Sequence, residues 1–247
     1  MATYTFGHDS AAVERLGLVA SAYEPVSRAF LARNARMGAN AAVDLGCGPA
    51  FSTELLDEVC SPERLMGVDS SVELVDVARR RFPRATFVVQ DLTTSPLRGA
   101  PADLMYARLL LAHLPDPLGT AERWRSELAP GGVLLVEDLE EIHAPRGPLR
   151  NYDEVSAGIV RQGGGTMYAG AQLAALGGTC AEVTVRAAIA ARIYLFNVDR
   201  WIREPETPAP LQVLTELRAG LAGVVDADNS ETVSWVVRQT VAGPIGD

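Results

Sequence analysis

Long hydrophobic runs and Cys-x-x-Cys pairs are missing from this sequence, and no run of consecutive basic residues is longer than Arg79–Arg81. No stretch approaches the roughly 20 consecutive apolar residues of a membrane-spanning helix. The N-terminus lacks the basic-then-apolar pattern of a signal peptide. The 22 Lys and Arg residues are outnumbered by 31 Asp and Glu residues, which gives a formal net charge of −9. Such a chain is not attracted to the phosphates of nucleic acids. We therefore expect a cytoplasmic protein that binds neither a membrane nor nucleic acid.

The few cysteines argue against a disulfide scaffold and against a cysteine-rich metal centre. Cys47, Cys60 and Cys180 lie far apart in the sequence and form no Cys-x-x-Cys pair. We expect reduced thiols and no structural metal.

Hydrophobic residues make up 48% of the 247 residues, which is enough for a full core. Between residues 41 and 137, short apolar runs alternate with segments in which apolar residues recur every three to four positions. This alternation is typical of strand–helix–strand units and a parallel sheet. The predicted strands are Ala41–Leu45, Arg64–Asp69, Ala85–Gln90, Ala102–Ala107 and Gly132–Glu137. Five strands alternating with helices predict a doubly wound α/β sheet.

The flanks of this core predict helices and two further strands. Before the core, the spacing of apolar residues predicts a helix that Pro25 breaks and a second helix that reaches the first strand. After the fifth strand the pattern is irregular, and Glu182–Val185 and Thr232–Val237 look like final strands. We expect one domain over 1–247, with an N-terminal helical lid (1–38), a core (39–142) and substrate-side helical insertions with the last strands (143–247).

The segment from Val43 to Phe51 is a strand that runs into a glycine turn and then into a helix. Glycines at 46 and 48 let the backbone turn sharply and come close to a ligand. The fingerprint of dinucleotide-binding proteins is Gly-x-Gly-x-x-Gly, and its third glycine is replaced by Phe51. The loop therefore lacks the pattern of an NAD or FAD site.

The acidic residue before the turn, the Gly46-x-Gly48 spacing and Asp69 after the second strand resemble the class I S-adenosylmethionine-dependent methyltransferases. Further segments fit the same resemblance in order, and they are Val89–Leu92, Tyr106–Arg108, His113–Pro117 and Leu128–Gly132. The sequence departs from this family at Ala50, where a third glycine is common. The resemblance implies a Rossmann-like, doubly wound, mostly parallel seven-stranded sheet with an antiparallel final strand.

The resemblance also implies S-adenosylmethionine as the cofactor and S-adenosylhomocysteine as its product. Acceptors for the methionine ammonium are expected at Gly46 and Asp44, and an acceptor for the ribose diol at Asp69. Ordinary alternatives are a tight turn for Gly46 and Gly48, a helix cap for Asp69, a turn for Asp91 and a surface ion pair for Arg108. The expected cofactor-binding residues are Tyr4, Arg15, Asp44, Gly46, Cys47, Gly48, Asp69, Ser70, Asp91, Leu92 and Arg108.

Methyl transfer is an in-line displacement in which placing the acceptor beside the methyl group supplies much of the acceleration. A base is needed only for an acceptor of high pKa. The candidates are Glu137 and His143, near the end of the fifth strand, and His113, for which a packed or capping role is the simpler interpretation.

The acceptor is expected to be a small apolar or aromatic molecule, because the segments outside the core are rich in aromatic residues. The residues concerned are the aromatic Tyr152, Tyr168, Tyr194, Phe196 and Trp201, together with Met167. Their alternative role is to form part of the core or the contact of a homodimer. Within the methyltransferases, the sequence most resembles the bacterial small-molecule enzymes of natural-product biosynthesis. Two alternatives keep the same cofactor residues: a non-methylating reaction such as a cyclisation, and a non-enzymatic cofactor-binding module.

Overall fold

One sheet forms the centre of the computed structural model, which describes residues 6–204, 206–227 and 230–245. Its strands are β1 (Ala41–Leu45), β2 (Arg64–Asp69), β3 (Thr86–Val89), β4 (Ala102–Arg108), β5 (Leu128–His143), β6 (Thr179–Arg186) and β7 (Thr232–Ala242). Their order across the sheet is β3-β2-β1-β4-β5-β7-β6. β1 to β5 pair in parallel, and β7 runs antiparallel to both of its neighbours. The predicted fold class is confirmed.

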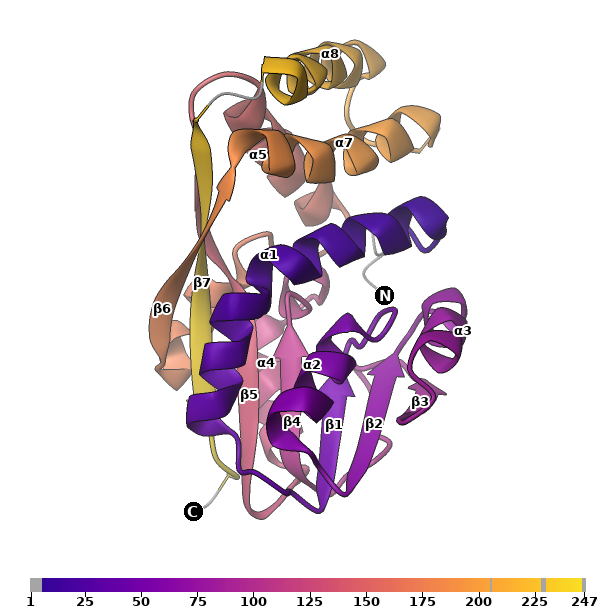
Figure 1. Ribbon diagram of the computed structural model, residues 1–247, viewed down its shortest axis with the longest axis vertical. Helices are drawn as coiled ribbons and strands as arrows, with labels where there is room; N and C mark the ends of the chain where they lie inside the picture. Colours follow the sequence, from indigo (N-terminus) through magenta and orange to yellow (C-terminus); the bar gives the residue numbers. More distant parts are fainter. Residues whose placement is uncertain (1–5, 205, 228–229, 246–247) are drawn as a thin grey trace.

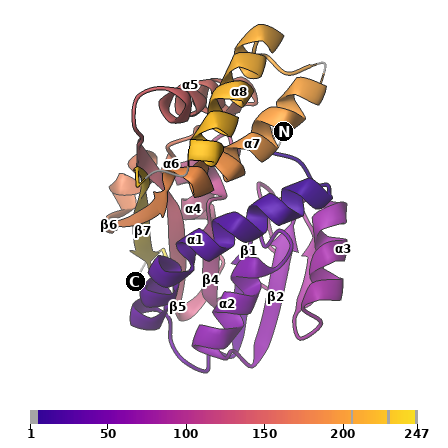
Figure 2. The same ribbon diagram turned by 45° about the horizontal axis from the view of Figure 1, so that its top comes forward.

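Helices cover both the faces and one end of this sheet (Figure 1). The helices are α1 (Ser10–Asn34), α2 (Phe51–Cys60), α3 (Val72–Arg81), η1 (Leu111–His113), α4 (Pro117–Arg125), α5 (Pro148–Gln162), α6 (Ala169–Leu173), η2 (Ala174–Leu176), α7 (Ala187–Arg203) and α8 (Leu211–Ala227). In Figure 1, α5, α7 and α8 lie above the carboxyl ends of the strands. Figure 2 shows α1 crossing the molecule between this helical cap and the sheet.

The central strands are buried because helices lie on both faces of the sheet. All five residues of β1 are buried, and Leu45, Leu104 and Leu134 are fully inaccessible to solvent. Continuous apolar runs of this kind are typical of parallel strands. Since the parallel strands share a direction, their carboxyl ends meet at one edge, where Asp69 and Arg108 are the last residues of β2 and β4. Ligands of such sheets bind at this edge.

The prediction that Pro25 ends the first helix is wrong. α1 continues through Pro25 to Asn34 and is bent in the middle, as Figure 1 shows. A proline within a helix removes one backbone hydrogen bond and kinks the helix without necessarily ending it. The buried face continues beyond the proline, since Tyr23 before it and Phe30 and Leu31 after it are all in the core. This burial outweighs the loss of one hydrogen bond.

Candidate active site

The glycine loop after β1 is a tight turn whose shape depends on Gly46. The N–H groups of Gly46 and Cys47 both donate to the Val68 carbonyl, at 2.8 and 3.1 Å. Gly46 has a φ of 71°, and a β-carbon there would lie 2.8 Å from the Leu110 side chain. Only glycine fits that position without strain. The chain also holds Ala50, the N-cap residue of α2, at a φ of 73°, a conformation that favours glycine.

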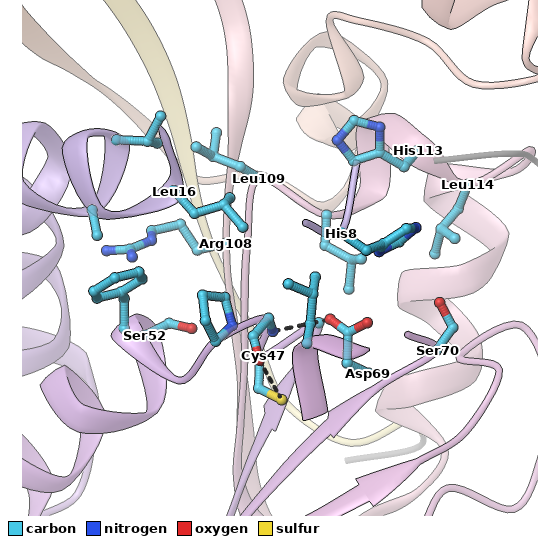
Figure 3. A pocket seen from close by; sticks show the side chains of 18 residues that line it. His8, Leu16, Cys47, Ser52, Asp69, Ser70, Arg108, Leu109, His113 and Leu114 are labelled. Atoms are coloured by element: carbon cyan, nitrogen blue, oxygen red, sulfur yellow. Dashed lines mark hydrogen bonds between the residues drawn. The ribbon is translucent and has the colours of Figure 1, made fainter. Parts of the chain in front are cut away.

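Asp69 points from the end of β2 toward this loop (Figure 3). Its carboxylate accepts hydrogen bonds from the N–H of Gly48 and the N–H of Ser71, both at 2.9 Å. Burial raises the pKa of Asp69, and the two backbone hydrogen bonds act in the opposite direction. A carboxylate oriented in this way retains lone pairs for a diol.

Asp44 lies behind the loop, where it holds the start of α2. Its Oδ2 accepts from Ser52 Oγ at 2.7 Å and from Thr53 Oγ1 at 2.6 Å. Its Oδ1 is buried without a hydrogen-bond partner among the described residues. Burial raises the pKa of Asp44 to about 6. A buried carboxylate oxygen without a partner is costly, and an ammonium group bound at the loop would offset this cost.

A cavity of about 160 Å³, open at its mouth, lies above the loop. In Figure 3, His113 and Leu109 lie across this cavity from Cys47 and Asp69. The predicted cofactor residues that line it are Gly46, Cys47, Gly48, Asp69, Ser70 and Arg108. The sequence-based prediction and the geometry therefore agree on the loop and on the ends of β2 and β4.

Other predicted cofactor residues lie elsewhere. Asp91 and Leu92 do not line the cavity: the Asp91 carboxylate accepts from the N–H and Oγ1 of Thr93, and the Leu92 carbonyl accepts from Trp124 Nε1. Tyr4 lies outside the described residues. Arg15 lines a different cavity, with its guanidinium carbon 5.2 Å from the centre of the Phe6 ring, so its expected contact with the cofactor is not part of this geometry.

That second cavity, of about 140 Å³, lies under the helical cap, and its lining includes the aromatic side chains of Phe6, Tyr23, Tyr152, Tyr194 and Trp235. Tyr152 and Tyr194 stack with their ring centres 3.8 Å apart, and Tyr23 stacks on Trp235 at 5.5 Å. The Tyr194 hydroxyl accepts from Trp235 Nε1 at 2.9 Å. Burial raises the pKa values of Tyr23 and Tyr194, so both phenols are neutral. Flat apolar walls of this kind favour a planar, apolar guest.

Of the aromatic and methionine side chains predicted for the acceptor, Tyr152, Met167 and Tyr194 line this cavity. Trp201 lies behind Tyr152 and stacks on it, and Tyr168 and Phe196 are not part of the lining. Sequence reasoning missed Trp235, Asn197 and Asp138. These residues come from β7, α7 and β5, which only the fold brings together.

The two cavities share a wall made of Leu16, Val19, Leu109 and His113. Leu109 has a φ of 53° and donates its N–H to the Glu137 carbonyl at 2.7 Å. A leucine in this conformation is strained, and strained residues concentrate at functional sites. His113 packs edge-on against Phe6, with the ring centres 5.4 Å apart. Molecules bound in the two cavities would therefore come closest to each other at this shared wall.

The geometry gives Glu137 and His143 no acid–base position. Glu137 is fully buried, accepts from Tyr106 Oη at 2.5 Å and from Gln239 Nε2 at 2.8 Å, and lines neither cavity. Its two hydrogen bonds tie β5 to β4 and β7. His143 is exposed and lies 3.1 Å from the Glu141 carboxylate. Of the predicted catalytic residues, His113 is the one that lines both cavities.

The buried imidazole of His113 makes stability depend on pH. Burial, and next the charge of Arg15, lower the pKa of His113 to about 4, whereas a histidine in an unfolded chain has a pKa of about 6.5. The unfolded chain therefore binds more protons between these pH values, and protonation favours unfolding as the pH falls from about 6.5 to about 4. We expect the free energy of unfolding of the wild type, relative to His113→Gln, to decrease across this window in urea titrations at several pH values. The exposed control His143→Gln keeps His113 and should show the same pH dependence as the wild type, whereas an unchanged pH dependence in His113→Gln would contradict this assignment.

Within the described ranges, no cluster of three His, Cys, Asp or Glu side chains is placed to hold a metal ion. Among the helices that the structure describes, none is long and apolar enough to cross a membrane.

A Rossmann-like sheet with a glycine turn after β1 and an acidic residue at the end of β2 defines a class of nucleotide-type cofactor sites. Residues 43–136 match the model of the family described as "Methyltransferase domain". Over these residues the chain is similar to the methyltransferases, as the glycine loop and its companion motifs predicted.

The curated relatives match part of this chain. Trans-aconitate 2-methyltransferase from Rhizobium leguminosarum bv. trifolii is 41% identical over 105 residues, which are 42% of this chain and 40% of the relative. The enzyme of the same name from an Azoarcus species is 38% identical over 137 residues, which are 55% of this chain and 49% of the relative. The chain thus matches less than half the length of either relative.

Solved structures of low identity share the fold over most of the chain. A putative methyltransferase from Bacillus halodurans has a TM-score of 0.56 at 12% identity and covers 86% of this chain and 96% of its own. The [4+2]-cyclase SpnF has a TM-score of 0.53 at 16% identity and covers 90% of this chain and 82% of its own. These similarities show the fold of the sheet and of its helical flanks. They do not identify the reaction, which depends on the residues of the site.

Proposed function

We propose that this protein transfers the methyl group of S-adenosylmethionine to a small apolar or aromatic acceptor. The observation that carries the proposal is the pair of cavities. One lies over the glycine loop and Asp69, the other is aromatic, and they meet at Val19, Leu109 and His113. An in-line displacement needs a donor and an acceptor held about 3 Å apart, and two adjoining cavities that share lining residues support such a placement.

Asp69 and Gly46 of the loop cavity fit the cofactor, because Asp69 has lone pairs for the ribose diol and Gly46 leaves room for the backbone to approach. Asp44, the acceptor predicted for the methionine ammonium, has an unpartnered Oδ1 but is fully buried behind the loop and does not line this cavity. When bound, the cofactor supplies a methyl group on a positively charged sulfur, which leaves as a neutral thioether without protonation. The chain itself binds, orients and excludes water, and these are the contributions that proximity catalysis requires.

The acceptor cavity does not suit a molecule with several negative charges. The named relatives act on trans-aconitate, a tricarboxylate, but the one arginine in this lining is Arg15, and Asp138 lies in the same cavity. Three carboxylates in such a site would be poorly compensated. The residues that line this cavity lie mostly outside residues 43–136, which match the family model. An acceptor that differs from that of the relatives is therefore compatible with the sequence identity between them and this chain. We therefore propose an uncharged, mainly apolar acceptor.

Two finer parts of the proposal concern the cellular role. A cytoplasmic location is supported by the free thiols of Cys47, Cys60 and Cys180, which a reducing compartment maintains. A role in natural-product biosynthesis rather than central metabolism is supported by the aromatic acceptor cavity, since central metabolites are mostly charged. Cyclisation and non-enzymatic binding are less well supported, because the curated relatives that share the core are named as methyltransferases.

The first experiment is calorimetric titration of the protein with S-adenosylmethionine and, separately, with NAD. We expect micromolar binding of S-adenosylmethionine and none of NAD, because Phe51 stands where a dinucleotide needs glycine. The loaded protein is then incubated with a panel of phenols, amines and carboxylic acids, and a mass gain of one methyl group is recorded. Absence of binding by a folded protein would overturn the proposed function. Binding without any methylated product would favour the non-enzymatic alternative.

A further inference from the structure

Asp138 is a buried carboxylate in the wall of the acceptor cavity. It lies on β5, is inaccessible to bulk solvent and lines the cavity together with Tyr23 and His113. Its Oδ2 accepts from the N–H of Leu111 at 2.8 Å, and its Oδ1 accepts from the N–H of Leu139 at 3.2 Å. Backbone N–H groups, which also include those of Leu110 and Ala112, thus fix the direction of the carboxylate.

The carboxylate lies next to the shared wall of the two cavities. Leu109, part of that wall, donates its N–H to the carbonyl of Glu137, the residue before Asp138. The Leu111 N–H that Asp138 accepts opens the η1 turn, which ends at His113, another residue of the wall. An acceptor group that reaches this wall from the aromatic cavity therefore comes close to Asp138.

No ion pair among the described residues involves Asp138. Its partner across the β5–β7 pairing, Arg238, binds Glu140 instead. Burial raises the pKa of Asp138 to about 7, although backbone N–H groups oppose the rise. The titratable and charged groups that line the cavity with it are Arg15 and Tyr23 from α1, His113 from η1, Tyr152 from α5 and Tyr194 from α7. Asp138 and Tyr23 also interact electrostatically. Such a carboxylate exchanges a proton near neutral pH.

We propose that Asp138 is the catalytic base of this enzyme and that its acceptor is an aromatic hydroxyl compound, a phenol. The inference rests on the proposed function and names its substrate class. The phenol ring lies between the tyrosine and tryptophan side chains, and its oxygen lies at the wall beside Asp138.

The step balances as a single displacement. The phenol O–H bond breaks, and its proton goes to the Asp138 carboxylate. The phenol oxygen forms the new O–CH₃ bond, the bond between that methyl carbon and sulfur breaks, and its electron pair stays on sulfur as a neutral thioether. The Asp138 proton passes to solvent when the ether leaves. A phenol has a pKa of about 10, so removal of its proton during attack lowers the barrier.

The charges of the cavity favour a phenol over the other acceptor classes. A carboxylate acceptor is already ionised, needs no base and would be repelled by Asp138 in a site of low polarity. An ammonium acceptor would be repelled by Arg15, which lines the same cavity. A neutral hydroxyl on a planar ring meets neither repulsion, and the stacked pairs Tyr152–Tyr194 and Tyr23–Trp235 provide its walls.

The test compares wild type and Asp138→Asn on two phenols of similar size. One is an ordinary phenol, protonated at pH 8, and the other is a nitrophenol that is already ionised at that pH. We expect Asp138→Asn to lower kcat/KM on the protonated phenol by about 10²–10⁴-fold and on the nitrophenol by less than about tenfold. In wild type, kcat/KM on the protonated phenol should rise as the pH increases through about 7. The matched control is Glu141→Gln, an exposed carboxylate on the same strand.

The outcomes separate this inference from the proposed function. Equal losses on both phenols would show that Asp138 only holds the η1 turn, and would overturn its role as base. Methylation of carboxylates or amines but not of phenols would overturn the substrate class while leaving the methyltransferase activity intact. S-adenosylmethionine binding by Asp138→Asn, measured by calorimetry, reports that the variant is folded. Asp138→Glu, which keeps a carboxylate, is expected to recover part of the activity on the protonated phenol.

Discussion

An Asp69→Ala variant is expected to bind S-adenosylmethionine at least about 100-fold more weakly than the wild type. The Asp69 carboxylate holds the Gly48 N–H and the Ser71 N–H, and it lines the loop cavity at the place where a ribose diol would lie. A hydrogen bond to a charged group contributes about 1.5–3 kcal/mol, and two are lost together with the order of the loop. Calorimetric titration measures the change.

The matched control for this variant is Asp76→Ala. Asp76 is an exposed carboxylate on α3 whose partner is Arg79 of the same helix, and it lies outside the loop cavity. Cofactor affinity should be unchanged in this control, because exposed ion pairs contribute little. Equal affinity in wild type and Asp69→Ala would contradict the assignment of Asp69 to the cofactor and leave it with the role of holding the turn.

A Met167→Trp variant is expected to lose at least about 100-fold in kcat/KM while it keeps its affinity for S-adenosylmethionine. Met167 lines the aromatic cavity and not the loop cavity. A larger side chain there fills space that the acceptor needs, and misplacement of the acceptor by about 1 Å costs about 10² in rate. Ser70→Trp is the complementary variant, since Ser70 lines the loop cavity alone, and we expect it to lose cofactor affinity. If both variants lost the same property, the division of the site into two cavities would be wrong.

The strand pattern and the loop chemistry could be predicted because they are local. β1 is a continuous buried run followed by a glycine turn, and the periods of α2 and α3 are visible within ten residues each. The aromatic and β-branched run Ile193–Val198 is a different case. It has strand-like composition but lies inside α7, where Ile193, Tyr194 and Val198 are buried against the helical cap. Burial overrides intrinsic preference in such a segment.

Among the candidate site residues, those of the loop were found from the sequence, and those of the acceptor cavity were mostly not. Glu137 and Asp138 are neighbours on β5, and strand geometry sends their side chains to opposite faces of the sheet. The sequence favoured Glu137, but Glu137 bonds to Tyr106 and Gln239 while Asp138 faces the cavity. Nothing in the sequence around them shows which face the cavity lies on.

The sequence by itself determined the doubly wound sheet, the glycine loop and the acidic residue at the end of β2, because each depends on residues close together in the chain. Only the tertiary structure decided that α1 passes through Pro25, that Arg15 belongs to the acceptor cavity and that Asp138 lies beside the shared wall. That cavity is assembled from α1, β5, α5, α7 and β7. Its shape depends on the packing of segments far apart in the chain, which local periodicity does not encode.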